Sequence, residues 1–414
     1  MSAVATDIAR ATTQPQPKRF RRGTHRTADP AETLARVRPH MARMGITRLG
    51  NITGLDRIGI PVAIAVRPNS RSVSVSQGKG LDLPQAMASA LMEACEGFHA
   101  EDIGPCRSAA YRDLVQRETV ADPEMLCPGG RPFDLSAHIQ WREGYDLLQR
   151  RFCWVPAEIV HTDYTVQHPD GFFLAGSNGL ASGNHLVEAI NAAAYELVER
   201  DAVALWVAQS LQHRARCALD LASIDDPDCR ALLKRYEAAG VAVRVWNVTT
   251  DIGIAAFVCE IRDQSAADPS RLRRYHGSGC HADRAIALSR ALTEAAQSRL
   301  TYIAGIRDDL SPAEYEEEDP DAAIGDALVD ALIAEIAAVR FRDVPSFAAD
   351  DLSEDLRRVL DRLHKAGIAR AVAVDLTRPE FGISVVRLVI PGLEWDPHHP
   401  NYRPGRRAEA MAAR

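Results

Sequence analysis

The sequence predicts a mixed α/β fold in which three turn–helix units surround one site lined by carboxylates. Two observations lead to this prediction. Patterns typical of strands alternate with patterns typical of long helices along most of the 414 residues. In addition, two alanines and two acidic or amide residues recur at offsets 0, 4, 7 and 10 in three stretches. These residues are Ala86, Ala90, Glu93 and Glu96; Ala189, Ala193, Glu196 and Glu199; and Ala287, Ala291, Glu294 and Gln297.

A glycine-containing segment precedes each stretch, at residues 76–80, 177–184 and 277–281. Glycine turns allow close approach of the backbone, and the helix N-terminus that follows attracts anions. On the helix, offsets of 3, 4 and 7 fall on one face. We therefore expect three turns, each leading into a helix with two alanines and two carboxylate or amide side chains along one stripe. The period of about 100 residues is too long for a solenoid and indicates repeated units within one body.

The other elements follow from local patterns. From the amino terminus we predict an extended arm at 1–30, a helix at 31–49, paired strands at 60–68 and 72–78, and the first recurring helix at 84–100. An irregular region at 105–170 with strands at 138–145 and 152–156 is followed by the second turn and helix at 175–212, strands at 242–249 and 254–262, and the third turn and helix at 276–304. The last predicted elements are a solvated acidic loop at 314–321, a helix at 351–366 and strands at 369–377 and 383–390.

The two ends of the chain differ in composition from the body at 31–394. The basic run at 18–26 is either a phosphate contact or a solvated tail. The tail at 395–414 holds four arginines and no long apolar run, so we expect it to be frayed or to lie on the surface. The sequence thus divides into an arm at 1–30, one folded body at 31–394 and a tail at 395–414.

Four glutamates are the leading candidates for metal ligands. Carboxylates beside alanines on a helix face are costly to bury unless a positive charge lies between them. Magnesium prefers oxygen ligands and usually takes one or two carboxylates plus phosphate oxygens, so four carboxylates imply more than one ion or some glutamates outside the direct ligand set. The alternative is an ordinary solvated helix face. The predicted metal ligands are Glu93, Glu96, Glu196 and Glu199.

Arginines and glycine-segment residues near these glutamates suit a phosphate group. Arg200 follows a predicted ligand directly, and Arg290 precedes Glu294 by four residues. Either arginine is a plain surface pair or, beside a polyphosphate, a bidentate clamp, and their positions on the recurring pattern favour the clamp.

Three further residues extend this candidate site. Lys79 either reaches a phosphate or caps its turn. Asn184 lies where a helix N-cap is expected, and its amide could also bind a nucleotide. Glu188 is a further ligand, an adenosine contact, or an exposed first-turn glutamate that favours the helix dipole.

Composition excludes several classes of function. A net charge of −7 gives no field for non-specific binding of nucleic acid. None of the eight cysteines forms a CxxC pair, and no histidine spacing matches HExxH, so we expect no zinc ribbon. Neither a signal-peptide core nor an apolar run of membrane-spanning length is present. These features predict a cytoplasmic protein that binds neither membranes nor nucleic acid, and they leave a homodimer open.

Three blocks of the sequence resemble the signature blocks of the YcaO family. They run from SVSQGKG to FHAE (74–101), from GSNGLASGN to VERDA (176–202) and from GSGCH to GIRDD (277–309), and the similarity extends from about residue 20 to 394. GTHR (23–26), the segment at 45–68 and the RDD after the third helix resemble the branch that works with a TfuA-like partner. The body at 31–394 is thereby expected to be a YcaO-like catalytic domain.

The resemblance implies ATP- and Mg²⁺-dependent phosphorylation of a peptide-backbone amide oxygen. By position, the four candidate ligands match the family's magnesium glutamates. The residues that match its nucleotide site are Asn184, Glu188, Arg200, Arg290 and Glu294. Lys79 and, in the amino-terminal arm, Arg26 complete the nucleotide-binding set that we predict. We expect no protein nucleophile, because the attacking group comes from the substrate or from sulfide.

The resemblance leaves the product open. A TfuA-like partner and a source of sulfide would give a thioamide in a ribosomally made peptide or protein, and we favour this product. Attack by a Cys, Ser or Thr side chain would give an azoline. Many azoline-forming members end in an alternating proline tail, whereas the prolines here stand at 397, 400 and 404 before an arginine-rich end. The alternative of another class is a non-catalytic scaffold that binds a peptide.

Overall fold

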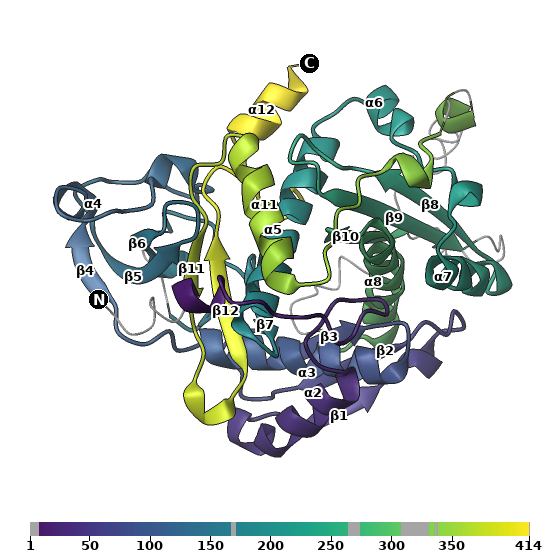
Figure 1. The fold of residues 1–414 in the computed structure, drawn as a ribbon, viewed down its shortest axis with the longest axis horizontal. Coiled ribbons are helices and arrows are strands. Elements are labelled where there is room, and N and C mark those ends of the chain that lie inside the picture. Colours follow the sequence, from purple (N-terminus) through teal and green to yellow (C-terminus); the bar gives the residue numbers. More distant parts are fainter. Residues whose placement is uncertain are drawn as a thin grey trace.

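The computed structural model describes residues 8–166, 171–263, 274–307, 331–334, 336 and 338–413. Helices and antiparallel sheets together confirm the predicted mixed α/β class (Figure 1). The acidic stretch predicted as a loop at 314–321 lies outside the described residues. No helix within the described ranges is long and apolar enough to cross a membrane.

The described strands form three antiparallel sheets. Their orders are β1-β2-β3, β10-β9-β8 and β4-β5-β11-β12-β7, with β6 paired to β5. The strands are Arg48–Asn51 (β1), Val62–Val66 (β2), Val75–Lys79 (β3), Arg107–Ala110 (β4), His138–Asp146 (β5), Arg151–Pro156 (β6), Leu180–Gly183 (β7), Val241–Asn247 (β8), Ala255–Asp263 (β9), Arg274–His281 (β10), Val372–Asp375 (β11) and Ser384–Val389 (β12).

Helices follow the strands and cover the sheets. The α-helices of the described part of the chain include Pro30–Val37 (α2), Leu83–Ala100 (α3), Tyr111–Leu114 (α4), Leu186–Val207 (α5), Leu211–Arg216 (α6), Pro227–Ala238 (α7), Arg284–Ala304 (α8), Leu352–Lys365 (α11) and Arg406–Ala412 (α12). The largest apolar cluster surrounds α5, which is buried along most of its length and lies beside α11 in Figure 1.

The three recurring stretches are helices α3, α5 and α8, each directly after the last strand of a described sheet. These strands are β3, β7 and β10, so the three segments predicted as turns are largely strands. Among their glycines only Gly179 has a positive φ, of 75°. The glycines instead let the strand lie directly on the helix. A Cβ atom on Gly78 would lie 2.2 Å from the carbonyl oxygen of Ala86, and one on Gly279 would lie 2.1 Å from that of Ala287.

The three strand–helix units also contact one another in a closed order. Helix α3 contacts β7 of the second unit, α5 contacts β10 of the third, and α8 contacts β3 of the first. In Figure 1, α3 lies below α5 and α8 lies to its right. The internal repeat of the sequence stays a prediction, but these contacts explain how glutamates far apart in the chain come to face one space.

The predicted helix at 31–49 is shorter in the structure. Helix α2 ends at Val37, and two short 3₁₀ turns, Arg38–His40 and Ala42–Met44, lead to Gly45 with φ 70°. Pro39 explains the break, because proline has no N–H to donate to the carbonyl group four residues earlier.

The amino-terminal arm packs into the body, so the reading of the basic run as a solvated tail is wrong. Lys18 forms an ion pair of 2.5 Å with Asp355, and both side chains are buried. The ring of His25 packs edge-on against His281, with 5.0 Å between the ring centroids.

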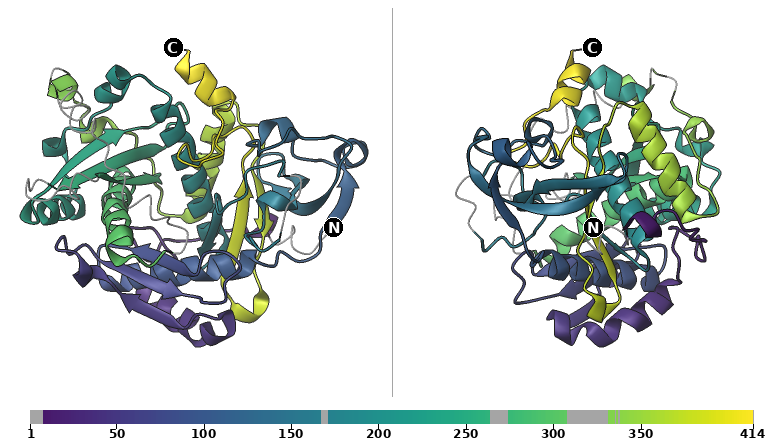
Figure 2. Two further views of the ribbon diagram at one scale, coloured as in Figure 1. Left: turned by 180° about the vertical axis from the view of Figure 1, so that it is seen from behind. Right: turned by 60° about the vertical axis from the view of Figure 1, so that its left-hand side comes forward.

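The carboxyl-terminal tail lies on the surface, which was one of the two alternatives that we expected, but it is anchored and ends in a helix rather than being frayed. Helix α12 packs against α5 and projects at one end of the molecule (Figures 1 and 2). Arg407 donates from Nε to Asp201 over 2.9 Å, and the Asp201 side chain is completely buried. An arginine that finds a buried acidic partner packs well, which composition alone does not show.

Candidate active site

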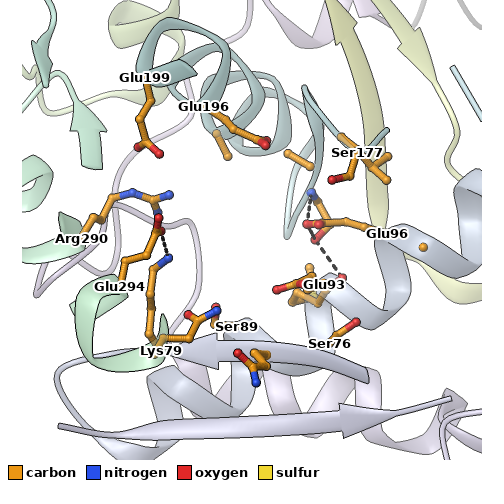
Figure 3. A pocket seen from close by; sticks show the side chains of 18 of the residues that line it. Ser76, Lys79, Ser89, Glu93, Glu96, Ser177, Glu196, Glu199, Arg290 and Glu294 are labelled. Carbon is orange, nitrogen blue, oxygen red and sulfur yellow. Dashed lines mark hydrogen bonds and ion pairs between the residues drawn. The ribbon is translucent and has the colours of Figure 1, made fainter. Parts of the chain in front are cut away.

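The three strand–helix units enclose a cavity of about 1060 Å³. All eleven residues that the sequence predicted for the site line it, although they come from the arm, from β3 and from all three helices. These residues are Arg26, Lys79, Glu93, Glu96, Asn184, Glu188, Glu196, Glu199, Arg200, Arg290 and Glu294. Figure 3 shows carboxylates of α3, α5 and α8 pointing into this space from three sides. The structure therefore brings the whole set together, while its role in binding ATP and magnesium stays a prediction.

Serines on the neighbouring strands orient three of the glutamates. Ser182 of β7 donates to Glu96 from its backbone N–H over 2.8 Å and from its hydroxyl over 2.7 Å. Ser278 of β10 donates its hydroxyl to Glu199 over 2.6 Å, and its N–H to Glu294 over 3.2 Å. The edge strands thus fix the direction of carboxylates that belong to other elements.

The sequence analysis missed both serines. Each stands directly before a strand glycine, at Ser182-Gly183 and Ser278-Gly279. This repeated Ser-Gly pair was a signal that comparison of the three segments could have found.

Burial raises the pKa values of four glutamates in the cavity. The pKa of Glu96 rises to about 8 and those of Glu93 and Glu196 to about 7, and neighbouring carboxylates contribute to each rise. Burial likewise raises the pKa of Glu199, with the charge of Glu294 as the second cause. Glu93 faces the water of the cavity, which screens its charge, whereas Glu199 is only 4% exposed. The set accepts protons readily near neutral pH, as expected for carboxylates that await a cation.

Glu294 behaves differently because it already has a cationic partner. Burial is the largest single influence and favours its neutral form, but the charge and hydrogen bond of Lys79 together with the charges of Arg200 and Arg290 outweigh burial and lower the pKa of Glu294 to about 2. Lys79 forms an ion pair with Glu294 across the cavity wall, which Figure 3 marks with a dashed line. The ammonium group that we predict to contact phosphate is therefore held in place by a carboxylate.

Several buried polar atoms in the cavity have no hydrogen-bond partner among the described residues. They are Glu199 Oε2, Arg200 Nε, Arg290 Nε and Gln297 Oε1. Unpartnered acceptors and donors side by side fit a bound group that carries both cations and anions, such as a metal–polyphosphate. Within the described ranges, no three acidic, histidine or cysteine side chains lie close enough to hold one metal ion alone. Magnesium suits such a site, because it usually completes its shell with phosphate oxygens and water.

Glu188 and Asn184 connect the amino-terminal arm to the start of α5. Glu188 accepts from the N–H and the hydroxyl of Thr27 over 2.8 and 2.9 Å, and from the side-chain amide of Asn184 over 3.1 Å. Arg26 lies 3.6 Å from the same carboxylate. Both oxygens of the Glu188 carboxylate thus accept from protein donors. This favours a role for Glu188 in the nucleotide site over a role as a metal ligand. The N-cap of α5 is His185, not Asn184 as expected.

The site contains a further wall that sequence reasoning did not predict. Trp395, Asp396, His398 and His399 of the tail line the cavity. Asp396 forms an ion pair of 3.2 Å with Arg200. No local pattern in the tail signals this contact, because it depends on how the tail packs on α5.

Comparison with known proteins decides the family. Residues 77–394 match the model described as YcaO cyclodehydratase, ATP- and Mg²⁺-binding. The chain belongs to the YcaO family. This finding confirms the predicted cofactors, ATP and Mg²⁺, and all the predicted site residues except Arg26 lie within the matched range.

Two relatives span nearly the whole YcaO chain. A protein encoded in the tfuA 3′ region of Rhizobium leguminosarum bv. trifolii is 39% identical over 386 residues, which cover 90% of this chain and 89% of the relative. An uncharacterized protein of Methanothermobacter thermautotrophicus is 34% identical over 371 residues, covering 88% and 94%. The first supports the predicted similarity to the branch associated with TfuA.

Solved structures confirm the YcaO fold. A heterocyclase in complex with substrate and cofactor superposes with a TM-score of 0.79 at 25% identity, covering 95% of this chain. This chain spans 55% of that heterocyclase's length. YcaO from Methanopyrus kandleri, bound with AMPPCP and Mg²⁺, has a TM-score of 0.70 at 22% identity and covers 92% of this chain and 95% of its own.

Proposed function

We propose that this YcaO protein uses ATP and Mg²⁺ to activate a peptide-backbone amide and, with a TfuA-like partner and a source of sulfide, to convert the amide to a thioamide. The observation that supports this proposal most is the set of carboxylates from three helices that faces lysine and arginine side chains in one cavity. The substrate is a ribosomally made peptide or protein, and the reaction takes place in the cytoplasm.

The chemistry explains why the site needs no protein nucleophile. Sulfide adds to the amide carbon, and the former carbonyl oxygen becomes the group that must leave. Bound ATP supplies the phosphoryl group that makes this oxygen a good leaving group. The carbon–oxygen bond then breaks, phosphate departs, and loss of the sulfur proton leaves a carbon–sulfur double bond. The nitrogen keeps its substituents throughout.

The residues of this chain position charge for that reaction. Glu93, Glu96, Glu196 and Glu199 would hold magnesium, and Arg290 and Lys79 would contact phosphate oxygens opposite them. Phosphoryl transfer depends mainly on such positioning and on neutralisation of charge. Arg290 suits this task because its planar fork can bind two phosphate oxygens, and its Nε has no partner among the described residues.

Azoline formation is the second candidate, and one observation favours it. The carboxyl-terminal tail lines the cavity, as expected for an enzyme whose tail completes the active site. In that reaction a Cys, Ser or Thr side chain of the substrate would attack in place of sulfide. The phosphorylated oxygen would leave in the same way.

Mass spectrometry of a candidate peptide separates these functions. The peptide is incubated with the protein, ATP, Mg²⁺ and sulfide, with and without a TfuA-like protein. We expect a mass gain equal to the replacement of one oxygen by sulfur. A loss of one water that needs no sulfide would instead establish azoline formation. A peptide that binds without any modification or ATP turnover would support a non-catalytic scaffold.

A further inference from the structure

Three consecutive residues of α5 connect the cavity to the carboxyl-terminal tail. Glu199 points into the cavity and accepts from Ser278. The next residue, Arg200, donates from one terminal nitrogen to Asp396 over 3.2 Å. Asp201 then accepts from Arg407 over 2.9 Å. A predicted metal ligand is therefore adjacent to two residues that hold the tail.

Glu394 holds separate parts of the tail together through hydrogen bonds. Its carboxylate accepts from the hydroxyl of Tyr402 over 2.8 Å, from the N–H of Gly405 over 2.8 Å and from the N–H of Ala408 over 2.9 Å. The segment between these anchors includes the residues that line the cavity. They are Trp395, Asp396, His398 and His399, and we call residues 395–399 the tail wall.

Arg200 has unused hydrogen-bonding capacity toward the cavity. Its guanidinium carries five N–H donors, of which one nitrogen binds Asp396, while its buried Nε has no partner among the described residues. Arg200 and Asp396 are each 30% exposed and both line the cavity. A planar fork in this position can hold two anions at once, one through each edge.

We propose that Arg200 binds Asp396 and a nucleotide phosphate simultaneously, so that nucleotide binding fixes the tail wall in the position where it contacts the peptide substrate. Asp396 is then a positioning residue that acts through Arg200. The contact with a peptide substrate rests on the proposed function. The contact of Arg200 with a nucleotide phosphate needs only Mg²⁺ and a nucleotide. The coupling between nucleotide binding and the position of the tail wall is reciprocal, so that each stabilises the other.

Trp395 provides the measurement. Of the five tryptophans, all of which the structure describes, it is the one that lines the cavity. We would measure acrylamide quenching of its fluorescence, with and without Mg²⁺ and β,γ-methylene ATP, and subtract the signal of Trp395→Phe. We expect the analogue to lower the quenching constant of Trp395 at least twofold in the wild-type chain.

Substitutions at Asp396 then test the coupling. Asp396→Asn should abolish this protection while nucleotide affinity stays within threefold of wild type, because the arginine keeps its phosphate contact. Asp396→Glu should restore the protection. Asp251→Asn is the matched control. Asp251 is a carboxylate partner of the tail residue Arg407 and does not line the cavity, so this variant should behave like the wild type.

Several outcomes would overturn the inference. They are unchanged quenching with the analogue bound, greater exposure of Trp395 on binding, full protection in Asp396→Asn, and no binding of the analogue. Failure of the proposed function gives a different result, because the peptide would then stay unmodified in mass spectrometry while nucleotide-dependent protection of Trp395 persisted and supported the coupling.

Discussion

Single carboxylates in the cavity are held by strands that belong to other units. Glu199 illustrates this, since one of its oxygens accepts from Ser278 and the other has no partner among the described residues. A carboxylate that is fixed in direction but half satisfied is prepared to bind a cation. It also destabilises the metal-free protein, because burial disfavours its charge.

We predict that Glu199→Gln abolishes ATP turnover while the fold persists. Loss of one charged ligand should lower turnover at least about a hundredfold, or about 2.7 kcal/mol of transition-state stabilisation. The metal-free melting temperature should hold or rise, because one buried like charge is gone. Steady-state kinetics and thermal melts check both points. Glu354→Gln, at a half-exposed glutamate of α11 outside the cavity that pairs with Arg357 and Arg358, should leave turnover unchanged.

A second prediction concerns pH. The pKa of Glu196 is raised from its ordinary value of 4.5 to about 7, so the folded state binds more protons than the unfolded state between these values. Its contribution to stability is therefore present below pH 4.5 and lost as pH rises through 7. In thermal melts without metal, Glu196→Gln should match the wild type near pH 5 and be the more stable protein near pH 8. An advantage that shrank with rising pH would contradict the assigned sign.

At the scale of elements, the glycine–alanine contacts join each edge strand to its helix. We predict that Gly279→Ala destabilises the protein severely, because its Cβ would lie 2.1 Å from the carbonyl oxygen of Ala287 and 2.6 Å from the backbone nitrogen of Ala291. Gly130→Ala is the matched control, since nothing lies within 4 Å of its Cβ position and its φ is not positive. Denaturant melts of the two variants should differ by several kcal/mol, and equal stability would show that the helix shifts freely.

The tail gives an element-scale prediction with adjacent residues as test and control. Arg407→Gln leaves Asp201 completely buried without its ion pair, which should cost about 3 kcal/mol. Arg406→Gln removes an exposed pair of 3.7 Å and should cost less than about 1 kcal/mol. Urea melts measure both. Equal costs would mean that the tail is not anchored as the structure shows.

The sequence predicted elements well where the signal is local. Strands β2, β3, β5, β6, β8 and β9 and helices α3 and α11 lie close to their expected ranges, because alternation and helical spacing are properties of neighbouring residues. The expected turns failed, because glycines in an edge strand resemble a turn unless the helix packed on them is known. The alternative of a frayed tail failed for a related reason, whereas the tail does lie on the surface as expected. Whether Arg407 frays or packs depends on Asp201, more than 200 positions away.

Site residues were easier to predict than their partners. The glutamates recur at fixed spacing in the sequence, because binding a cation requires several carboxylates. Ser182 and Asp396 act through contacts that only the fold creates. Lys79 and Arg200, both predicted to bind the nucleotide, illustrate the difference. Both line the cavity, but each is already paired with a carboxylate that no spacing rule identifies.

For the whole molecule, we predict that magnesium and nucleotide bind cooperatively. Magnesium usually takes one or two carboxylates together with phosphate oxygens and water, so we expect protein and nucleotide each to supply part of its coordination. Calorimetry should show nucleotide affinity at least tenfold higher with Mg²⁺ than with chelator, about 1.4 kcal/mol of coupling. Tight binding in chelator that magnesium did not change would count against this arrangement.

The closed order of the three units has a consequence for solubility. Strands β3, β7 and β10 each end a described sheet, and an open sheet edge is a template for pairing with another chain. On two of these edges, β7 and β10, a glutamate accepts from a backbone N–H group, because Ser182 and Ser278 donate to Glu96 and Glu294. Truncating such a glutamate to alanine would therefore expose a strand edge as well as remove a charge. We therefore expect a variant that loses one of these glutamates to be more prone to aggregation as well as altered at the predicted site.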